Sequence, residues 1–238
     1  MPIRRCILAA ALLCATGWGT GTIRVGAFSQ GAPGQLPDDW EPMTLGHAAP
    51  SSYTLVREEE GVVIRAEAQD AASGLVRRVN LDAARYPVLE WRWKAENVIE
   101  AGTVDRRRGD DYAARLYVTF AYDPSRLSFG ERVKYEAAKA LSGGDVPLRA
   151  LSYVWANHRR ETEMVPNPYT DWVMMIPVES GAENVGAWRT ERRNLYDDYR
   201  QAFGEEPPAI SGIAVMTDTD DTGATATAYY GDIVLKSE

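Results

Sequence analysis

Near the middle of its 238 residues the chain reads Leu89-Glu90-Trp91-Arg92-Trp93-Lys94. Alternate side chains of a β-strand point to opposite faces of a sheet, so the leucine and both tryptophans share one face and the charged residues share the other. The preceding Arg85-Tyr86-Pro87 disfavours a helix and leads into extended chain. We therefore predict a strand with one face in a core, and we interpret Trp91 and Trp93 as core residues.

Runs of the same kind recur along the chain, each rich in the aromatic and β-branched residues that favour strands. Three of them are Arg115-Leu116-Tyr117-Val118-Thr119-Phe120, Ser152-Tyr153-Val154-Trp155-Ala156-Asn157 and Ala226-Thr227-Ala228-Tyr229-Tyr230-Gly231. We expect further strands at 53–56, 62–66, 74–79, 173–178, 210–217 and 225–235, with a turn at Gly61 between the first two. Strands that outnumber helices in this way predict an all-β, antiparallel β-sandwich.

Two segments have helical spacing instead. Phe129, Val133, Ala137 and Leu141 are four apart, and Gly143-Gly144 follows them. Leu195, Tyr199 and Phe203 repeat this spacing between Asn194 and Gly204. Both patterns predict amphipathic helices with recognisable ends, inserted into the sandwich as lids on the sheets or their edges.

The amino terminus is typical of a secretory signal peptide. Arg4 and Arg5 precede an apolar run from Ile7 to Ala15 that is too short to span a bilayer. We expect a leader of residues 1–27 cleaved after Ala27, although Ala15 or Gly17 would also serve, and an uncleaved anchor is the alternative. A flexible lead would follow at 28–39, and a single domain at 40–238. These features predict an exported protein, either periplasmic or secreted.

Composition narrows the function classes. Both cysteines, Cys6 and Cys14, lie in the leader, so the mature chain would have neither disulfides nor cysteine-ligated zinc. Cleavage after Ala27 would also remove three arginines and change the net charge from -8 to -11. So acidic a chain is a poor partner for nucleic acid. No second apolar stretch is long enough to span a membrane.

Two strands carry candidate ligand-binding residues. Arg115 and Tyr117 share one face of their strand, and Tyr153, Trp155 and Asn157 share one face of theirs. Aromatic rings stack on the apolar faces of sugars while arginine and asparagine pair with hydroxyl groups, so this set suits a glycan. Aromatic residues on strands also commonly fill cores, and either assignment of the faces is open from sequence alone.

Acidic residues form two further candidate sites. Asp110 and Asp111 follow Arg106-Arg107-Arg108, and could act as acid and base, orient Arg115 toward a ligand, or neutralise the neighbouring arginines. The turn Asp218-Thr219-Asp220-Asp221-Thr222-Gly223 offers three carboxylates, which predicts calcium as a cofactor; a solvated acidic turn is the alternative. The two histidines, His47 and His158, lie in no catalytic motif.

Several phrases together resemble a bacterial family of proteins of unknown function, DUF3047. They are Ser73-Gly74-Leu75-Val76-Arg77-Arg78, Leu89-Glu90-Trp91-Arg92-Trp93, Gly109-Asp110-Asp111-Tyr112, Tyr153-Val154-Trp155, Asp197-Asp198-Tyr199-Arg200 and Met216-Thr217-Asp218-Thr219-Asp220-Asp221. The resemblance runs from about Trp40 to the end and implies a shared fold and an exported bacterial protein, but no activity. Tyr229-Tyr230-Gly231-Asp232-Ile233 also resembles the last strand of jelly-roll carbohydrate-binding modules, which implies a jelly-roll-like sandwich.

Three hypotheses of function follow. The first is an exported, non-catalytic domain that binds a glycan or other small polar ligand on one sheet face. The second is a hydrolase or lyase acting on polysaccharides, with pairs among Asp110, Asp111, Asp218 and Asp220 as acid and base. The third is a cell-envelope module that binds another protein.

Overall fold

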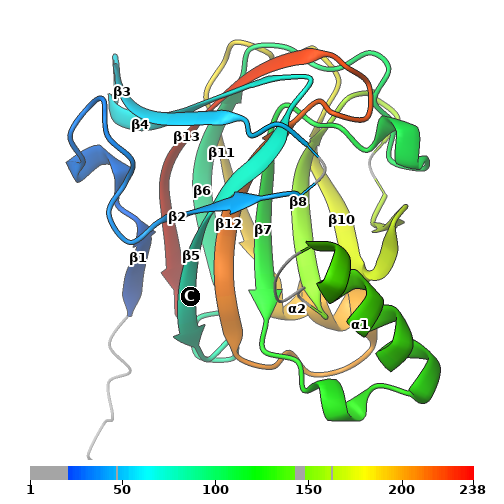
Figure 1. The fold of residues 1–238 in the computed structure, drawn as a ribbon. Helices are drawn as coiled ribbons and strands as arrows, with labels where there is room; N and C mark the ends of the chain where they lie inside the picture. The colour runs from blue at the N-terminus through cyan, green and yellow to red at the C-terminus, as the bar shows by residue number, and fades with distance from the viewer. Residues whose placement is uncertain (1–20, 47, 143–147, 162) are drawn as a thin grey trace, which may run out of the picture.

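The computed structural model describes residues 21–46, 48–142, 148–161 and 163–238. They form an antiparallel, jelly-roll-like β-sandwich with two helical insertions, which confirms the predicted fold class (Figure 1). One departure is the pairing of β10 with β8, which is parallel. None of the described helices is long and apolar enough to cross a membrane.

The six-stranded sheet has the order β11-β6-β13-β4-β3, and β1 also pairs with β13. The seven-stranded sheet has the order β2-β5-β12-β7-β8-β10-β9 and faces the viewer in Figure 1. The strands of the first sheet are β1 Thr22–Gly26, β3 Ser52–Glu58, β4 Gly61–Gln69, β6 Val88–Ala95, β11 Arg189–Asn194 and β13 Thr225–Lys236. Those of the second are β2 Glu41–Thr44, β5 Ala72–Leu81, β7 Arg115–Phe120, β8 Ala150–Ala156, β9 Val165–Asn167, β10 Thr170–Ser180 and β12 Ile210–Asp218.

Aromatic rings fill the space between the sheets. Trp91 and Trp93 of β6 are buried with their ring centres 5.4 Å apart, as the alternation of that strand predicts. They meet two rings of β8: Trp91 lies 5.2 Å from Tyr153, and Trp93 lies 6.0 Å from Trp155. Large buried rings contribute strongly to core stability, so these four residues join the two sheets at the centre of the sandwich.

The folded part of the chain begins earlier than the predicted boundary at Trp40. β1 pairs with β13 from Thr22 onward, and Val25 is buried in the core. A short 3-10 helix, η1 Phe28–Gln30, follows and places the Phe28 ring 5.1 Å from Trp40. Residues 28–39, expected as a flexible lead, therefore begin with a core residue. The first twenty residues of the expected leader lie outside the described part of the chain.

The two helices differ in how well their patterns predict packing. In α2 Leu195–Phe203 the side chain of Asn194 caps the first turn, and Leu195 and Tyr199 are buried, as expected. In α1 Phe129–Ser142 the predicted core face is wrong, because Phe129 is 85% exposed and Val133 is 55% exposed. The predicted positions Ala137 and Leu141 lie outside the side chains that the structure describes. Tyr135 is the buried residue instead, in a small cluster with Trp172, Leu127 and Leu148.

Candidate functional site on the seven-stranded sheet

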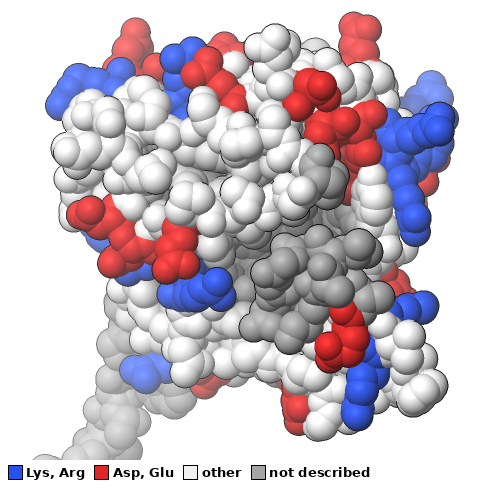
Figure 2. Space-filling model, in the orientation of Figure 1, with Lys and Arg blue, Asp and Glu red and all other residues white. Residues whose placement is uncertain are grey.

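The outward face of the seven-stranded sheet contains a cavity of about 510 Å³, within the range of about 300–1,000 Å³ that is usual for small-molecule sites. Figure 2 shows this face of the molecule in space-filling form. The lining comes from all seven strands, from the loop before β7 and from the loops that follow β2, β9 and β12. It includes Met43, Leu45, Val76, Arg78, Asp110, Arg115, Tyr117, Thr119, Ala150, Asn167, Tyr169, Val173, Ser211, Gly212, Ala214, Met216, Asp218, Asp220 and Asp221.

Small residues on the central strands form the floor of the cavity. Strand register places Gly212 of β12 beside Thr119 of β7 and Arg78 of β5, and the next row holds Ala214 beside Tyr117. A Cβ atom at position 212 would lie 3.0 Å from the Thr119 hydroxyl oxygen, closer than side chains normally pack. β12 therefore presents almost no side-chain volume to the cavity here, whereas Ile213 and Val215 of the same strand fill the core.

Arg115 organises one end of the cavity. Its side chain is 2% exposed, and its guanidinium binds Asp218 through two nitrogens, one of them at 2.9 Å. A third nitrogen donates to Asp110 at 3.1 Å and to the Tyr117 hydroxyl at 3.2 Å. The ring of Tyr112 packs against the guanidinium, 4.3 Å from its central carbon. So many charge-assisted bonds hold the arginine in one orientation and leave it few donors for a ligand.

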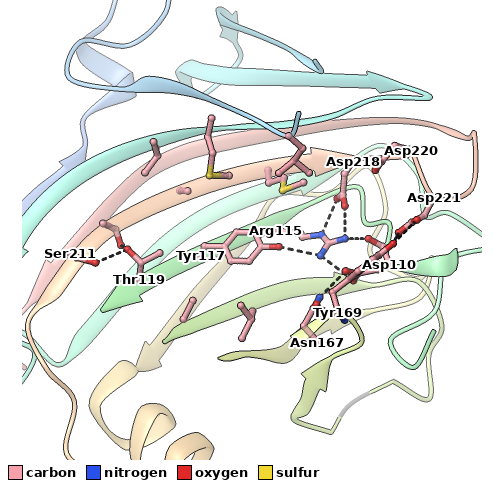
Figure 3. A pocket seen from close by; sticks show the side chains of 18 of the residues that line it. Asp110, Arg115, Tyr117, Thr119, Asn167, Tyr169, Ser211, Asp218, Asp220 and Asp221 are labelled. Carbon is pink, nitrogen blue, oxygen red and sulfur yellow. Dashed lines mark hydrogen bonds and ion pairs between the residues drawn. The ribbon is translucent and has the colours of Figure 1, made fainter. Parts of the chain in front are cut away.

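Further acidic and polar groups extend this end toward solvent (Figure 3). Asn167 donates to Asp110 at 2.7 Å, and the hydroxyl of Tyr169 donates to Asp221 at 2.8 Å. Tyr169 is 51% exposed at the mouth of the cavity. At the opposite end the hydroxyls of Thr119 and Ser211 lie 2.9 Å apart, and strand register places Arg78 near them. The site thus has an acidic end, a largely apolar floor and a hydroxyl end.

The acidic end perturbs the titration of its own carboxyl groups. Burial raises the pKa of Asp218 well above its usual value, and the neighbouring Asp110 and Asp111 add to this rise while Arg115 opposes it. Burial likewise raises the pKa of Asp110, again against the effect of Arg115. The pKa of Asp221 is raised by burial and by nearby carboxylates. Burial is thus the main cause of the raised pKa values, and the positive charge of Arg115 opposes it at Asp110 and Asp218.

The predicted metal residues are only partly together. Carboxylate oxygens of Asp111, Asp218 and Asp220 lie within 4.8 Å of one another, whereas Asp221 bonds Tyr169. The oxygens of Asp111 accept hydrogen bonds from the Asp221 and Thr222 amides, and those of Asp218 accept from Arg115. These contacts suit a calcium ion poorly, because calcium needs six to eight oxygen ligands and a guanidinium already faces one of the three carboxylates.

The structure divides the predicted ligand-binding face. Arg115, Tyr117 and Asp110 line the cavity, as expected of residues on one face of β7 and the loop before it. The expectation that Tyr153 and Trp155 point outward with them is wrong, because both rings are fully buried between the sheets. Their polar atoms are satisfied there: the Tyr153 hydroxyl donates to Asp198 at 2.8 Å, and the Trp155 indole donates to the Gly181 carbonyl.

Asn157 and Asp111 are buried too, in structural roles. The Asn157 amide donates to the Asp111 carbonyl at 2.7 Å and accepts from the amide of Ile99. Asp111 fixes the turn after β12 through its bonds to the backbone at positions 221 and 222. Sequence reasoning missed the floor residues Gly212 and Ala214 and the rim residues Asn167 and Tyr169. The alternation of small and large residues along 211–216 is the one signal in the sequence that marks the floor.

The fold and the cavity together define a class, a β-sandwich domain with a ligand-sized pocket on the outward face of one sheet. Residues 38–234 match the model of a family described as protein of unknown function, DUF3047. The chain therefore belongs to this family, as its motifs suggest. None of the curated proteins matches the chain in sequence.

Several solved structures resemble this one in shape at low sequence identity. The family 11 carbohydrate-binding module of a cellulosomal cellulase of Clostridium thermocellum superposes with a TM-score of 0.46 at 13% identity, covering 90% of this chain and 94% of that one. A family 29 carbohydrate-binding module superposes with a TM-score of 0.39 at 9% identity, covering 92% of this chain and 93% of that one. Endoglucanase 3 of Trichoderma harzianum, from family GH12, superposes with a TM-score of 0.41 at 6% identity, covering 92% of this chain and 97% of that one.

Proposed function

We propose that this chain binds a small polar ligand, with a short glycan as the favoured class, in the cavity of the seven-stranded sheet. One observation carries the proposal: an outward-facing cavity joins an apolar floor to polar groups at both ends. Sugar rings have an apolar face of C–H groups and an edge of hydroxyls, so a floor of small residues suits the first and the ends suit the second. The exposed ring of Tyr169 supplies a stacking surface at the mouth. The basic, apolar leader supports export as the setting of this binding.

The geometry supports binding better than hydrolysis. Glycosidases hold two carboxyl groups about 5 to 10 Å apart on opposite sides of the scissile bond. Here Asp110 and Asp218 lie on the same guanidinium at one end of the cavity, and the other end offers hydroxyls. Both carboxyl groups thus line the same end of the cavity and do not face each other across its floor.

Filling the floor tests the proposal. Ala214→Leu would place a large side chain in the cavity and should abolish binding of any saccharide that raises the melting temperature of the wild-type protein. Tyr169→Ala should weaken that binding about fivefold, because an aromatic contact is worth about 1 kcal/mol. The control is Ala187→Leu, a matched change at an exposed position outside the cavity.

Calorimetric titration with short neutral and charged oligosaccharides measures the affinities, and circular dichroism confirms that each variant is folded. The proposal fails if no saccharide binds to the wild-type protein. It also fails if the leucine variant at position 214 is folded and binds as tightly as the control.

The calcium site predicted from the sequence can be tested by measuring the melting temperature. We expect the melting temperature to be the same in calcium and in a chelator, because Arg115 already supplies the positive charge that Asp218 faces. If calcium instead raises the melting temperature by several degrees, and Asp220→Asn removes this rise, the predicted metal site is supported.

A further inference from the structure

Two arginines line the cavity, and they differ in how many of their donors are in use. Every guanidinium nitrogen of Arg115 already bonds a neighbouring side chain or carbonyl. Arg78 is largely exposed, and within the described part of the chain its one ion pair is with Glu41. That contact runs from Nε at 3.6 Å, which is too long for a hydrogen bond. The guanidinium of Arg78 can therefore bond a ligand in the cavity.

Arg78 lies across a gap from the hydroxyl pair. Strand register pairs Gly212 of β12 with Arg78 of β5 on one side and with Thr119 of β7 on the other. Neighbouring strands are about 4.8 Å apart, so β5 and β7 lie about 10 Å apart across this glycine. Because Gly212 has no side chain, the space between the two polar groups is open. A sugar ring that forms a hydrogen bond on each side fits this span.

The donors at this end suit a negatively charged group. A planar guanidinium matches the two oxygens of a carboxylate. The hydroxyl of Ser211 adds a donor whenever Thr119 donates to it, since either oxygen of that pair can be the donor. At the other end of the cavity Arg115 has no donor left, and the carboxyl groups of Asp218 and Asp221 disfavour an anion. An anionic group on a ligand therefore has one favourable position in the cavity, beside Arg78.

We infer that the ligand is an acidic saccharide, whose carboxylate pairs with Arg78 while hydroxyls of the same ring meet Thr119 and Ser211. This inference rests on the proposed function and names its substrate class. Arg78 is the residue that determines specificity for the acid. Glu41 competes with the ligand for the same guanidinium, because it is the acidic partner that Arg78 has in the unliganded protein.

A matched set of ligands tests the carboxylate directly. Oligosaccharides of equal length built from glucose, from glucuronic acid and from the methyl ester of glucuronic acid differ only at carbon 6 of each ring. The acid should bind about fivefold more tightly than the other two, the effect expected of one exposed ion pair. The ester has nearly the size of the acid but no charge, so it separates charge from shape. Calorimetric titration of the intact protein measures all three affinities.

Variants of the ion pair test the protein side. Arg78→Gln removes the positive charge and should reduce the preference for the acid over the ester to about one. Glu41→Gln removes the competing carboxylate and should raise that preference about twofold. Both side chains are exposed, so both variants should fold, and their melting temperatures check that they do.

A second ion pair supplies the control. Arg159 and Glu183 lie 3.5 Å apart with side chains 83% and 69% exposed, against 78% and 67% for Arg78 and Glu41. Neither lines the cavity. Arg159→Gln and Glu183→Gln make the same changes of charge elsewhere on the surface, and should leave the preference for the acid at its wild-type value.

The outcomes separate the inference from the proposed function. If the acid binds no more tightly than the ester, the inference is wrong and glycan binding stands. If Arg78→Gln keeps the preference, or if Arg159→Gln loses it equally, the carboxylate does not pair with Arg78 and the inference is again wrong. If none of the three binds, the inference is wrong, whereas the proposed function fails only when the wider set of saccharides also shows no binding.

Discussion

At the scale of single residues, Arg115 links the stability of the protein to its site. Its guanidinium is buried and shared by two carboxyl groups, both of which have pKa values raised by burial. Ion pairs of this kind contribute little compared with a well-packed apolar core, but removing one partner leaves a buried charge without compensation. The residue is therefore a support of the acidic end and not a free ligand-binding group.

Arg115→Gln should lower the free energy of unfolding by about 3–5 kcal/mol at neutral pH. Arg115 opposes the rise in the pKa of Asp110 and Asp218, so its loss raises both further. A folded-state pKa above the unfolded value gives stability below the unfolded pKa that is lost as pH rises. The deficit of the variant relative to the wild type should therefore grow from pH 4 to pH 8. Urea unfolding at several pH values measures it, and Arg78→Gln is the exposed control; a deficit that shrinks with pH would contradict this account.

The sequence predicts that Tyr153 binds a ligand, but in the structure it is buried in the core. Tyr153→Phe removes the hydrogen bond that the Tyr153 hydroxyl donates to Asp198 and should cost about 1–2 kcal/mol of stability, although Asp198 keeps its bonds to Arg193. Saccharide affinity should not change, because the ring lies on the core side of β8. A loss of affinity in a stably folded variant, measured by calorimetry, would show that the assignment of faces is wrong.

At the scale of elements, β1 belongs to the fold although it lies within the predicted leader. The backbone at Gly21 already bonds Ser237, and Val25 is fully covered. Cleavage after Ala27 would therefore remove a strand of the six-stranded sheet. Cleavage after Ala15 or Gly17, the other sites in the sequence, would leave it intact, and we propose that processing occurs there.

Two truncated chains test the role of β1. A chain beginning at Gly21 should unfold at the same urea concentration as the processed protein. A chain beginning at Phe28 should be less stable by at least about 1.5 kcal/mol, the value of burying one valine side chain. Intact mass of the protein purified from cells gives the natural amino terminus, and a start at Phe28 in a fully stable protein would contradict the proposal.

The strands also show how much of the fold and of the candidate site can be predicted from the sequence. For β6 and β7 one face is apolar and the other polar, so alternation identifies the core side and places Arg115 and Tyr117 outside it. For β8 every residue is buried, because further side chains cover its outer face as well. Alternation then separates two faces without saying which is inward, and so Tyr153 and Trp155 are misplaced. The cavity floor is harder still to predict from the sequence, because Gly212 and Ala214 contribute to it by having small side chains that leave space open.

At the scale of the whole molecule, both sheets are organised around strands from the end of the chain. β12 lies between β5 and β7 in one sheet, and β13 lies between β4 and β6 in the other. A chain that stops at Gly223 keeps both helices and β12 but lacks β13, so its remaining strands β4 and β6 have no common neighbour. We expect this chain to show no cooperative urea transition and to be cut rapidly by protease. A cooperative transition in it would contradict this view.

The position of β13 has a consequence for the order of events in the cell. Ribosomes make a protein from its amino terminus, so β4 and β6 emerge long before the strand that must join them. Nascent chains that lack β13 therefore have no finished six-stranded sheet, and β1 also needs the same partner. The six-stranded sheet is thus completed only after β13 has been made, and until then β1, β4 and β6 each lack the neighbour that this strand supplies.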